Sequence, residues 1–295
     1  MNIILRPVFN RPEMLKLSLE YEEAARKESD LADDFLTVFL IEYGSPEETR
    51  QLLRDYPYNK LGIERTTKHG LSKNILTGMR VAFEKADDYV IYIEDDILLH
   101  RTYFNYMKEL LNMFNSSEFS VLSSYNSNDN GSVNEVYRGH HYAALAPLIN
   151  KYFFDKYIKP CAIPAYYKKR SKFVLNLNDK YKMHWGGKYK YKGSAMHNEQ
   201  AGLINRLVDV ALIEEDMYVI MPRVNRHTHI GFGGKNRRSK PLVGNSFEER
   251  LEYLREIIKT PEGMYDMTLS KEYNDYKIFC EEKLNKWDGS LCLKN

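Results

Sequence analysis

The sequence predicts an α/β protein with a mostly parallel sheet flanked by helices. Short apolar runs rich in β-branched residues alternate with segments of helical periodicity over residues 2–93, as in repeated strand–helix units. The fourth apolar run stops on three consecutive acids, Glu94, Asp95 and Asp96. Ligands of parallel sheets bind outside the carboxyl ends of the strands, so these acids are predicted to lie at a functional site.

The first two strand–helix units have recognisable boundaries. Asn2 to Phe9 is a strand candidate, and Pro12 fits the first turn of a helix that runs to about Arg26. Leu36 to Ile41 is apolar, as expected for a strand covered on both faces. Ser45, Pro46 and Glu48 then have the spacing of a capping box, which predicts that Ser45 caps a second helix.

The later elements are predicted from the same signals. They are strands at Gly62 to Arg65, Tyr89 to Ile93 and Met217 to Met221, and helices at Ser72 to Lys85, Tyr103 to Met113, from Ser246, and at about Ser270 to Lys286. We expect a single compact domain with three parts. They are residues 1–130, residues 131–245 and residues 246–295, of which the last would form packing helices.

Composition indicates a globular cytoplasmic protein. The 295 residues are 43% hydrophobic, which is ample for a core. No basic, apolar start typical of a signal peptide and no transmembrane segment is recognisable. Cys161, Cys280 and Cys292 are odd in number and far apart, which is typical of reduced thiols rather than a disulfide framework or a metal site.

Charge is unevenly distributed along the chain. Residues 151–240 contain 19 Lys and Arg against 7 Asp and Glu, an excess of 12 positive charges, although the whole chain carries only +2. Tyrosine and phenylalanine are interleaved with these basic residues. Such a mixture is typical of a surface that binds a polyanion, and a solvated lysine face over a tyrosine-rich core is the alternative.

The acidic motif favours a divalent metal. Three adjacent carboxylates repel one another unless a cation lies between them. Mg²⁺ and Mn²⁺ take carboxylate oxygens together with the oxygens of a diphosphate, so Glu94, Asp95 and Asp96 suit a metal and nucleotide site. A solvated acidic turn is the alternative.

Other polar residues are expected at the same edge of the sheet, because they follow predicted strands or begin a predicted helix. Basic groups there could hold phosphates, and a carboxylate could accept hydrogen bonds from a base or ribose. The predicted donor-binding residues are Arg6, Asn10, Arg11, Glu42, Lys73, Asn74, Glu94 and Asp95.

The order of these motifs resembles a known family. The motifs are Asn10-Arg11-Pro12 after a strand, Glu42 followed by Gly44-Ser45-Pro46, Gly70 to Asn74, and Glu94-Asp95-Asp96. Together they resemble the nucleotide-sugar glycosyltransferases of the GT-A fold, and the Glu-Asp-Asp variant is most similar to the N-acetylglucosaminyltransferase I type. The resemblance implies that Asp96 binds the metal directly, with Glu94 and Asp95 toward nucleoside and sugar and Glu42 on base or ribose.

The resemblance also implies that residues 1–130 bind the nucleotide-sugar donor and that residues 131–245 supply acceptor binding and catalysis. Inverting transfer needs a carboxylate that takes the proton of the acceptor hydroxyl. Glu199 begins an amphipathic segment, and in this fold an acid at the start of a late helix commonly serves as base. Asp209 and Asp179 are weaker candidates, and dipole-favoured placement of Glu199 at a helix start is the alternative. Some members of this fold place a late histidine on the metal or diphosphate, and His229 fits that role. A hydrogen-bonded structural histidine is the alternative.

We therefore expect a metal-dependent, inverting glycosyltransferase that uses Mn²⁺ or Mg²⁺ and a nucleotide sugar, first of all a UDP-sugar. The acceptor is predicted to be a polyanion, either duplex DNA with hydroxymethylated bases, as modified by phage-type enzymes, or an anionic bacterial surface glycan. A nucleotidyltransferase and an inactive nucleotide- or glycan-binding module are the other hypotheses. The predicted polyanion-binding residues are Lys168, Lys169, Arg170, Lys188, Lys190, Lys235, Arg237 and Arg238.

Overall fold

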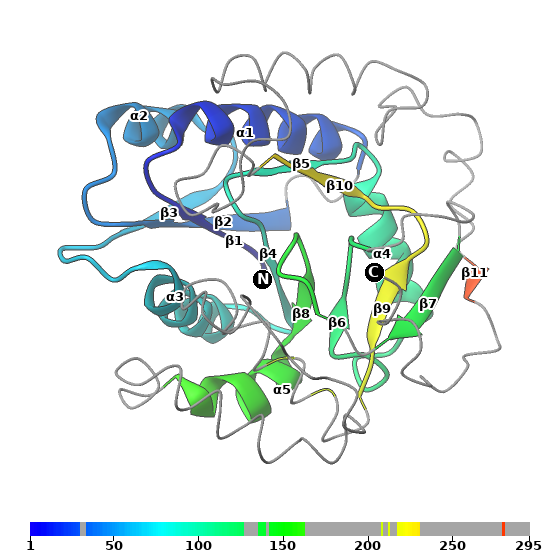
Figure 1. Ribbon diagram of the computed structural model, residues 1–295. Coiled ribbons are helices and arrows are strands. Elements are labelled where there is room, and N and C mark those ends of the chain that lie inside the picture. Colours follow the sequence, from blue (N-terminus) through cyan, green and yellow to red (C-terminus); the bar gives the residue numbers. More distant parts are fainter. Residues whose placement is uncertain are drawn as a thin grey trace, which may run out of the picture.

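The computed structural model has one large mixed sheet flanked by helices, together with a small two-stranded sheet (Figure 1). The large sheet has the strand order β11-β7-β9-β6-β8-β4-β1-β2-β3. The structure describes residues 1–29, 34–126, 135–139, 142–162, 208, 212, 217–230 and 279–280. None of the helices described in these ranges is long and apolar enough to cross a membrane.

Four neighbouring strands of the large sheet are parallel, as the sequence predicts. They are β4, β1, β2 and β3 in spatial order. Their bounds are Tyr89–Tyr92 (β4), Asn2–Val8 (β1), Phe35–Ile41 (β2) and Lys60–Glu64 (β3). Because all four run in the same direction, their carboxyl ends meet at one edge, where the candidate site lies.

The strands after residue 120 extend the same sheet with mixed directions. β8 is antiparallel to both β4 and β6, β9 is parallel to β6, and β7 is antiparallel to β9. Separately, β5 pairs antiparallel with β10 and forms the small sheet. Their bounds are Ile97–Leu99 (β5), Val121–Leu122 (β6), Glu135–Gly139 (β7), Leu148–Asn150 (β8), Val219–Pro222 (β9), His227–His229 (β10) and Phe279–Cys280 (β11).

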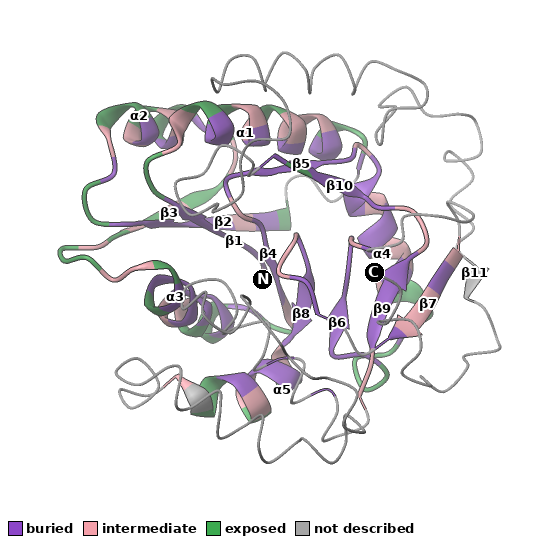
Figure 2. Ribbon diagram, in the orientation of Figure 1, coloured by how far each residue is buried: buried purple, intermediate pink, exposed green. Residues whose placement is uncertain are grey.

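Helices cover both faces of the sheet. α1, α2 and α4 lie on one face, and α3 and the short α5 lie on the other (Figure 1). Their bounds are Pro12–Lys27 (α1), Glu47–Asp55 (α2), Tyr103–Met113 (α4), Leu71–Lys85 (α3) and Lys151–Phe153 (α5). The neighbouring strands β4, β1 and β2 are buried along most of their length, whereas the edge strand β3 is partly exposed and α1 and α2 present exposed outer surfaces (Figure 2). Continuous apolar strands are thus explained by burial on both faces.

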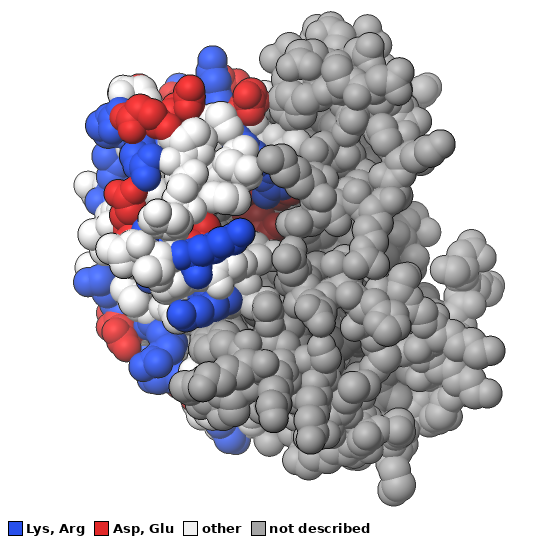
Figure 3. Space-filling model, turned by 60° about the vertical axis from the view of Figure 1, so that its left-hand side comes forward, with Lys and Arg blue, Asp and Glu red and all other residues white. Residues whose placement is uncertain are grey.

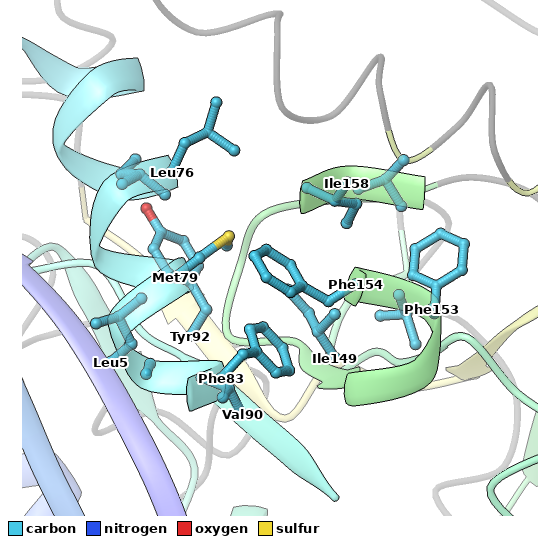
Figure 4. Packing of buried hydrophobic residues seen from close by; sticks show 14 of the residues in the cluster. Leu5, Leu76, Met79, Phe83, Val90, Tyr92, Ile149, Phe153, Phe154 and Ile158 are labelled. Carbon is cyan, nitrogen blue, oxygen red and sulfur yellow. The ribbon is translucent and has the colours of Figure 1, made fainter. Parts of the chain in front are cut away.

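The core facing α3 is packed by aromatic side chains. Phe83 of α3 and Phe154, in the π-helical turn Phe154–Ile158, are stacked with ring centroids 4.1 Å apart (Figure 4). Gly78 lets α3 approach β2 closely, because a Cβ atom there would lie 2.0 Å from a methyl carbon of Leu40. This tight contact fixes α3 and the loop before it against the carboxyl ends of the strands.

The prediction that Ser45 caps α2 in a capping box is wrong. The helix begins at Glu47, and Pro46 occupies the N-cap position without a side-chain hydrogen bond. The hydroxyl of Ser45 instead donates to the carbonyl oxygen of Glu42, at 2.8 Å. Ser45 therefore closes the turn after β2, where Gly44 has a φ of +81°, rather than capping the helix.

Candidate functional site

The acidic motif lies between β4 and β5. Ile93 continues the pairing of β4 by donating its backbone N–H to the carbonyl oxygen of Leu5, and the chain then turns through Glu94, Asp95 and Asp96. Asp95 and Asp96 are each only 4% exposed. The structure therefore buries carboxylates at the carboxyl ends of β1 and β4, which excludes the solvated acidic turn.

Only one of the two carboxylate oxygens of Asp96 accepts a hydrogen bond from the described residues. Its Oδ2 accepts a hydrogen bond from Arg11 Nη1 at 2.6 Å and lies 3.4 Å from His229 Nε2. Its Oδ1 is buried and has no hydrogen-bond partner among the described residues. Burial raises the pKa of Asp96, but the hydrogen bond from His229 and the charge of Arg11 outweigh burial and hold the pKa below its usual value.

His229 faces the acids from β10, which pairs with β5 in the small sheet. β10 places the two histidines of His227–His229 on opposite sides, as the spacing predicts. His227 is buried and hydrogen-bonded to Ser124, and burial lowers its pKa to about 3. The side chain of His229 is 47% exposed, and although burial lowers its pKa, the hydrogen bond and charge of Asp96 raise it overall.

The other two acids, Glu94 and Asp95, have pKa values above those of free carboxylic acids. Burial, followed by the charge of Asp96, raises the pKa of Glu94 to about 7. The hydroxyl of Tyr92 donates to Glu94 Oε1 at 2.8 Å. Burial raises the pKa of Asp95 to about 6, although Arg11 opposes the shift through its charge and its hydrogen bonds. The cations around this loop therefore do not fully compensate for the negative charge of its three carboxylates.

Arg11 supplies the cation that the sequence analysis assigned to a metal. Its guanidinium bonds to both Asp95 and Asp96, and its pKa is raised because their charges outweigh the effect of burial. The side chain is 29% exposed. A metal is therefore not required as the only cation between these carboxylates. The guanidinium of Arg11 already contacts Asp95 and Asp96 directly.

The prediction that Arg6 binds the donor is wrong. Its side chain is fully buried and forms an ion pair with Glu22 and a hydrogen bond with Ser18. Arg6 Nη2 also lies 3.5 Å from the carbonyl oxygen of Glu94. Because its guanidinium is enclosed by α1 and the acidic loop, Arg6 has no surface with which to contact a nucleotide.

A second group forms around Glu42. Glu42 Oε1 accepts the backbone N–H groups of Tyr43 and His69, at 2.9 and 3.0 Å. The carboxylate thereby connects the turn after β2 to the loop before α3. Asn10 and Lys73 are exposed at this edge, where each is free to contact a ligand.

Arg65 is a site residue that the sequence analysis missed. It follows the carboxyl end of β3, and its guanidinium donates to Asn74 Oδ1 at 2.8 Å and to Thr77 Oγ1 at 2.9 Å. Burial lowers its pKa, and the charge of Glu42 opposes the shift. The rule that selected Glu42 and the acids, position directly after a parallel strand, also applies to Arg65. Asn74 is thus an acceptor for Arg65 rather than an unengaged amide.

Comparison with protein families identifies the chain. The model of glycosyl transferase family 2 matches residues 4–175, more than half of the chain. This chain belongs to glycosyl transferase family 2. It accordingly has the GT-A-like fold of a family 2 glycosyltransferase. The matched residues include Arg11, Glu42 and the acidic motif.

Similar solved structures share little sequence with this glycosyltransferase. Residues 1–349 of S. aureus TarS match with 12% identity and a TM-score of 0.44, over 94% of this chain and 89% of that one. A longer TarS chain matches with 14% identity and a TM-score of 0.41, over 52% and 29%. The mannosyltransferase PcManGT from Pyrobaculum calidifontis, in complex with GDP-Man and Mn²⁺, matches with 12% identity and a TM-score of 0.38, over 52% and 46%. The family 2 chain thus spans less than half of the last two proteins.

No match is found among curated proteins.

Asp96 and His229 fit a divalent metal. Asp96 offers a buried oxygen that lacks a hydrogen-bond partner among the described residues, and His229 offers an imidazole nitrogen 3.4 Å from the other carboxylate oxygen. Carboxylate suits Mg²⁺ and Mn²⁺, whereas imidazole is more typical of transition metals. No cluster of three or more His, Cys, Asp or Glu that could hold a metal is found in the described ranges.

Several predicted residues of this glycosyltransferase lie outside the described ranges. They are the base candidates Glu199, Asp209 and Asp179, and the basic residues Lys168, Lys169, Arg170, Lys188, Lys190, Lys235, Arg237 and Arg238. The helix expected from Ser246 lies there too, and all of these remain predictions. The helix expected at Ser270 to Lys286 is wrong at Phe279–Cys280, which forms strand β11 because it pairs with β7.

Proposed function

We propose that this family 2 enzyme transfers a sugar from a UDP-sugar to an acceptor hydroxyl with inversion, using Mn²⁺ or Mg²⁺ held by Asp96 and His229. The observation that carries the proposal is the buried Asp96 carboxylate. One of its oxygens lacks a hydrogen-bond partner among the described residues, and the other lies 3.4 Å from His229 Nε2. This arrangement lies at the carboxyl ends of parallel strands, where α/β enzymes bind their ligands.

The residues around Asp96 have separate tasks in this proposal. When bound, the divalent metal supplies positive charge that stabilises the leaving diphosphate. Arg11, which is partly exposed and already contacts Asp95 and Asp96, can turn its guanidinium toward the diphosphate as the acids engage the metal. Glu42, which fixes the loop at His69, would contact the base or ribose. Glu94 and Asp95 would face the nucleoside and donor sugar.

Glu199 remains the proposed catalytic base. Inversion requires a carboxylate on the face of the sugar opposite the diphosphate, where it takes the proton of the acceptor hydroxyl. The resemblance to the GT-A fold, in which an acid at the start of a late helix commonly serves as base, supports this assignment, with Asp209 and Asp179 as alternatives. Glu199→Gln should reduce sugar transfer by at least about 100-fold while leaving donor binding unchanged.

A donor panel tests the proposal. UDP-GlcNAc, UDP-glucose, GDP-mannose and a CMP-sugar are incubated with the wild type and with Asp96→Asn, each with Mn²⁺, with Mg²⁺ or with a chelator. Release of the nucleotide is then followed by chromatography. We expect metal-dependent release of UDP by the wild type and none by the variant. Release from a GDP-sugar alone would reject the UDP assignment, and equal release with chelator would reject the metal.

The acceptor is proposed to be a polyanion. The support is the excess of 12 positive charges over residues 151–240, interleaved with aromatic residues. On the described part of the face in Figure 3, basic and acidic side chains are instead interspersed. The proposal therefore depends on the basic stretch itself and includes duplex DNA with hydroxymethylated bases and an anionic surface glycan.

Salt dependence separates the two acceptors. Binding to duplex DNA, measured by fluorescence anisotropy from 50 to 200 mM salt, should weaken by about 10³-fold if six or more phosphates are contacted. A triple variant, Lys168→Gln with Lys169→Gln and Arg170→Gln, should bind more weakly and with a smaller salt slope. If the wild type shows no salt-dependent DNA binding, the DNA acceptor is rejected and the anionic glycan is tested by transfer of radiolabelled sugar.

A further inference from the structure

A buried network beneath the acidic motif bonds to the backbone of the loop that carries it. Ser18 Oγ, on α1, donates to the carbonyl oxygen of Ile97 at 2.5 Å. Arg6 Nη2, on β1, lies 3.5 Å from the carbonyl oxygen of Glu94. These two carbonyl groups flank Asp95 and Asp96. The contacts from α1 and β1 therefore reach the loop immediately before and immediately after its two buried aspartates.

The direction of the hydrogen bonds in this network is determined by Ser18. A hydroxyl has one proton, and Ser18 donates it to Ile97, so its oxygen accepts the hydrogen bond from Arg6. Arg6 in turn forms an ion pair with Glu22, one helical turn beyond Ser18 on α1. Glu22 thus orients Arg6, and Arg6 orients Ser18. All three side chains are fully buried.

The loop is held from the opposite side as well. The backbone N–H of Ile230 donates to the carbonyl oxygen of Asp96 at 2.9 Å, directly after His229 in the sequence. The carbonyl groups of Glu94, Asp96 and Ile97 are therefore engaged by partners on three different elements. The fixed backbone determines the direction in which the Asp96 carboxylate points toward His229.

Stability alone does not explain a charged network at this position. Buried ion pairs are often no more stabilising than well-packed apolar residues of similar volume, because desolvation opposes their attraction. Apolar side chains could fill the space between α1 and the sheet, but they could not donate hydrogen bonds to the carbonyl groups of Glu94 and Ile97. The donors of Ser18 and Arg6 are both directed at this one loop.

We propose that Ser18, oriented by Arg6 and Glu22, is a positioning residue that fixes the Glu94–Ile97 backbone and so aims Asp96 at the metal and diphosphate. The inference rests on the proposed metal and nucleotide site. Ser18 touches neither ligand. It acts through the carbonyl group of Ile97, as outer hydrogen-bond partners do when they orient the ligands of a metal.

The test compares Ser18→Ala with Thr37→Val. Thr37 Oγ1 belongs to the same network, where it bonds to Arg26 and Tyr56 rather than to the acidic loop. Both variants remove a fully buried hydroxyl, so both should lower the melting temperature to a similar extent. Mn²⁺ affinity in the presence of UDP is measured by electron paramagnetic resonance. Ser18→Ala should weaken it by about 10-fold, and Thr37→Val by less than about twofold.

The outcomes separate this inference from the proposed function. If the wild type binds Mn²⁺ with UDP and both variants bind equally well, Ser18 is a structural residue only. If the wild type does not bind them, the proposed site itself is rejected. Ser18→Cys retains a weak donor at the same position and provides a second test should Ser18→Ala fail to fold. It should weaken Mn²⁺ binding in the same direction but by less, and unchanged affinity would overturn the inference.

Discussion

Two neighbouring buried clusters of charged residues differ in how well their charges are balanced. In the first, Glu22 lies between Arg6 and Arg26 and is also bonded by the hydroxyl of Tyr56. The second consists of the three acids of the Glu94–Asp96 motif, with Arg11 and the half-exposed His229 as the cations that contact them. One cluster alternates in sign, and the other has a surplus of negative charge.

This difference separates a supporting network from a ligand site. Desolvation of a buried charge is unfavourable unless an opposite charge and hydrogen bonds compensate for it. Charges of Arg6 and Arg26 outweigh burial and lower the pKa of Glu22, whereas burial and the neighbouring charge of Asp96 raise the pKa of Glu94 to about 7. The carboxylate of the first cluster has its cations within the protein, whereas the acidic cluster has an unmet demand for a cation.

The largest effect is expected from Glu22→Gln, which would leave two buried guanidinium groups without their counter-charge. Breaking a buried ion pair by removing one partner lowers the free energy of unfolding by about 3–5 kcal/mol. Urea denaturation followed by circular dichroism measures the change. Glu47→Gln is the control, because Glu47 pairs with Arg54 on the exposed surface of α2 and should change stability little. Similar stability for the two variants would contradict the distinction between the clusters.

The second prediction concerns pH and the acidic cluster. The pKa values of Glu94 and Asp95 are raised to about 7 and about 6, so the folded protein retains protons that the unfolded chain has already released. The free energy of unfolding should therefore fall as pH rises through this range, by on the order of 2 kcal/mol between pH 5 and pH 8. The raised pKa of His229 acts in the same direction, since its ion pair with Asp96 is lost as pH rises.

Chemical denaturation at several pH values, with and without Mn²⁺, measures this dependence. Bound Mn²⁺ should remove most of the loss at high pH because it supplies the missing positive charge. The same dependence with and without Mn²⁺ would show that the acids are not coupled to a metal.

A smaller effect is expected from Arg11→Gln. Arg11 occupies Oδ2 of Asp96 in the absence of a metal, so removing its charge should tighten binding of Mn²⁺ alone by roughly fivefold. Arg50→Gln is the matched control, because Arg50 pairs with Glu64 rather than with the acids. Titration of Mn²⁺ by electron paramagnetic resonance distinguishes the two variants. Weaker Mn²⁺ binding in Arg11→Gln would show that Arg11 supports the metal rather than competing with it.

The parallel half of the fold is predictable from the sequence because its inner strands β4, β1 and β2 are covered on both faces. The apolar run Leu36 to Ile41 and the helix expected at Pro12 to Arg26 correspond to β2 and α1 within a residue or two. The failure at Ser45 has a local cause. A hydroxyl near a helix start can cap the helix or close the preceding turn, and at Ser45 the carbonyl group of Glu42 lies within reach.

The site was only partly predictable. Position after a strand correctly brought Arg11 and the acids together, but it could not distinguish Arg11 from Arg6. Which of these side chains turns into the core depends on Glu22 and Ser18, which lie on α1 rather than on the strand that carries Arg6. The spacing of Ser18, Glu22 and Arg26 at four-residue intervals is the signal that could have revealed the buried network.

Isothermal titration of UDP and Mn²⁺ into the wild type and Asp96→Asn tests the central claim most directly. Asp155→Asn, a change at the surface ion pair with Lys159, serves as the control. We expect metal-dependent UDP binding by the wild type and the control, and a loss of more than about 100-fold in Asp96→Asn, because a direct ligand should matter more than its outer partners. Equal binding by wild type and Asp96→Asn would contradict the assignment of the acidic cluster as the metal and nucleotide site.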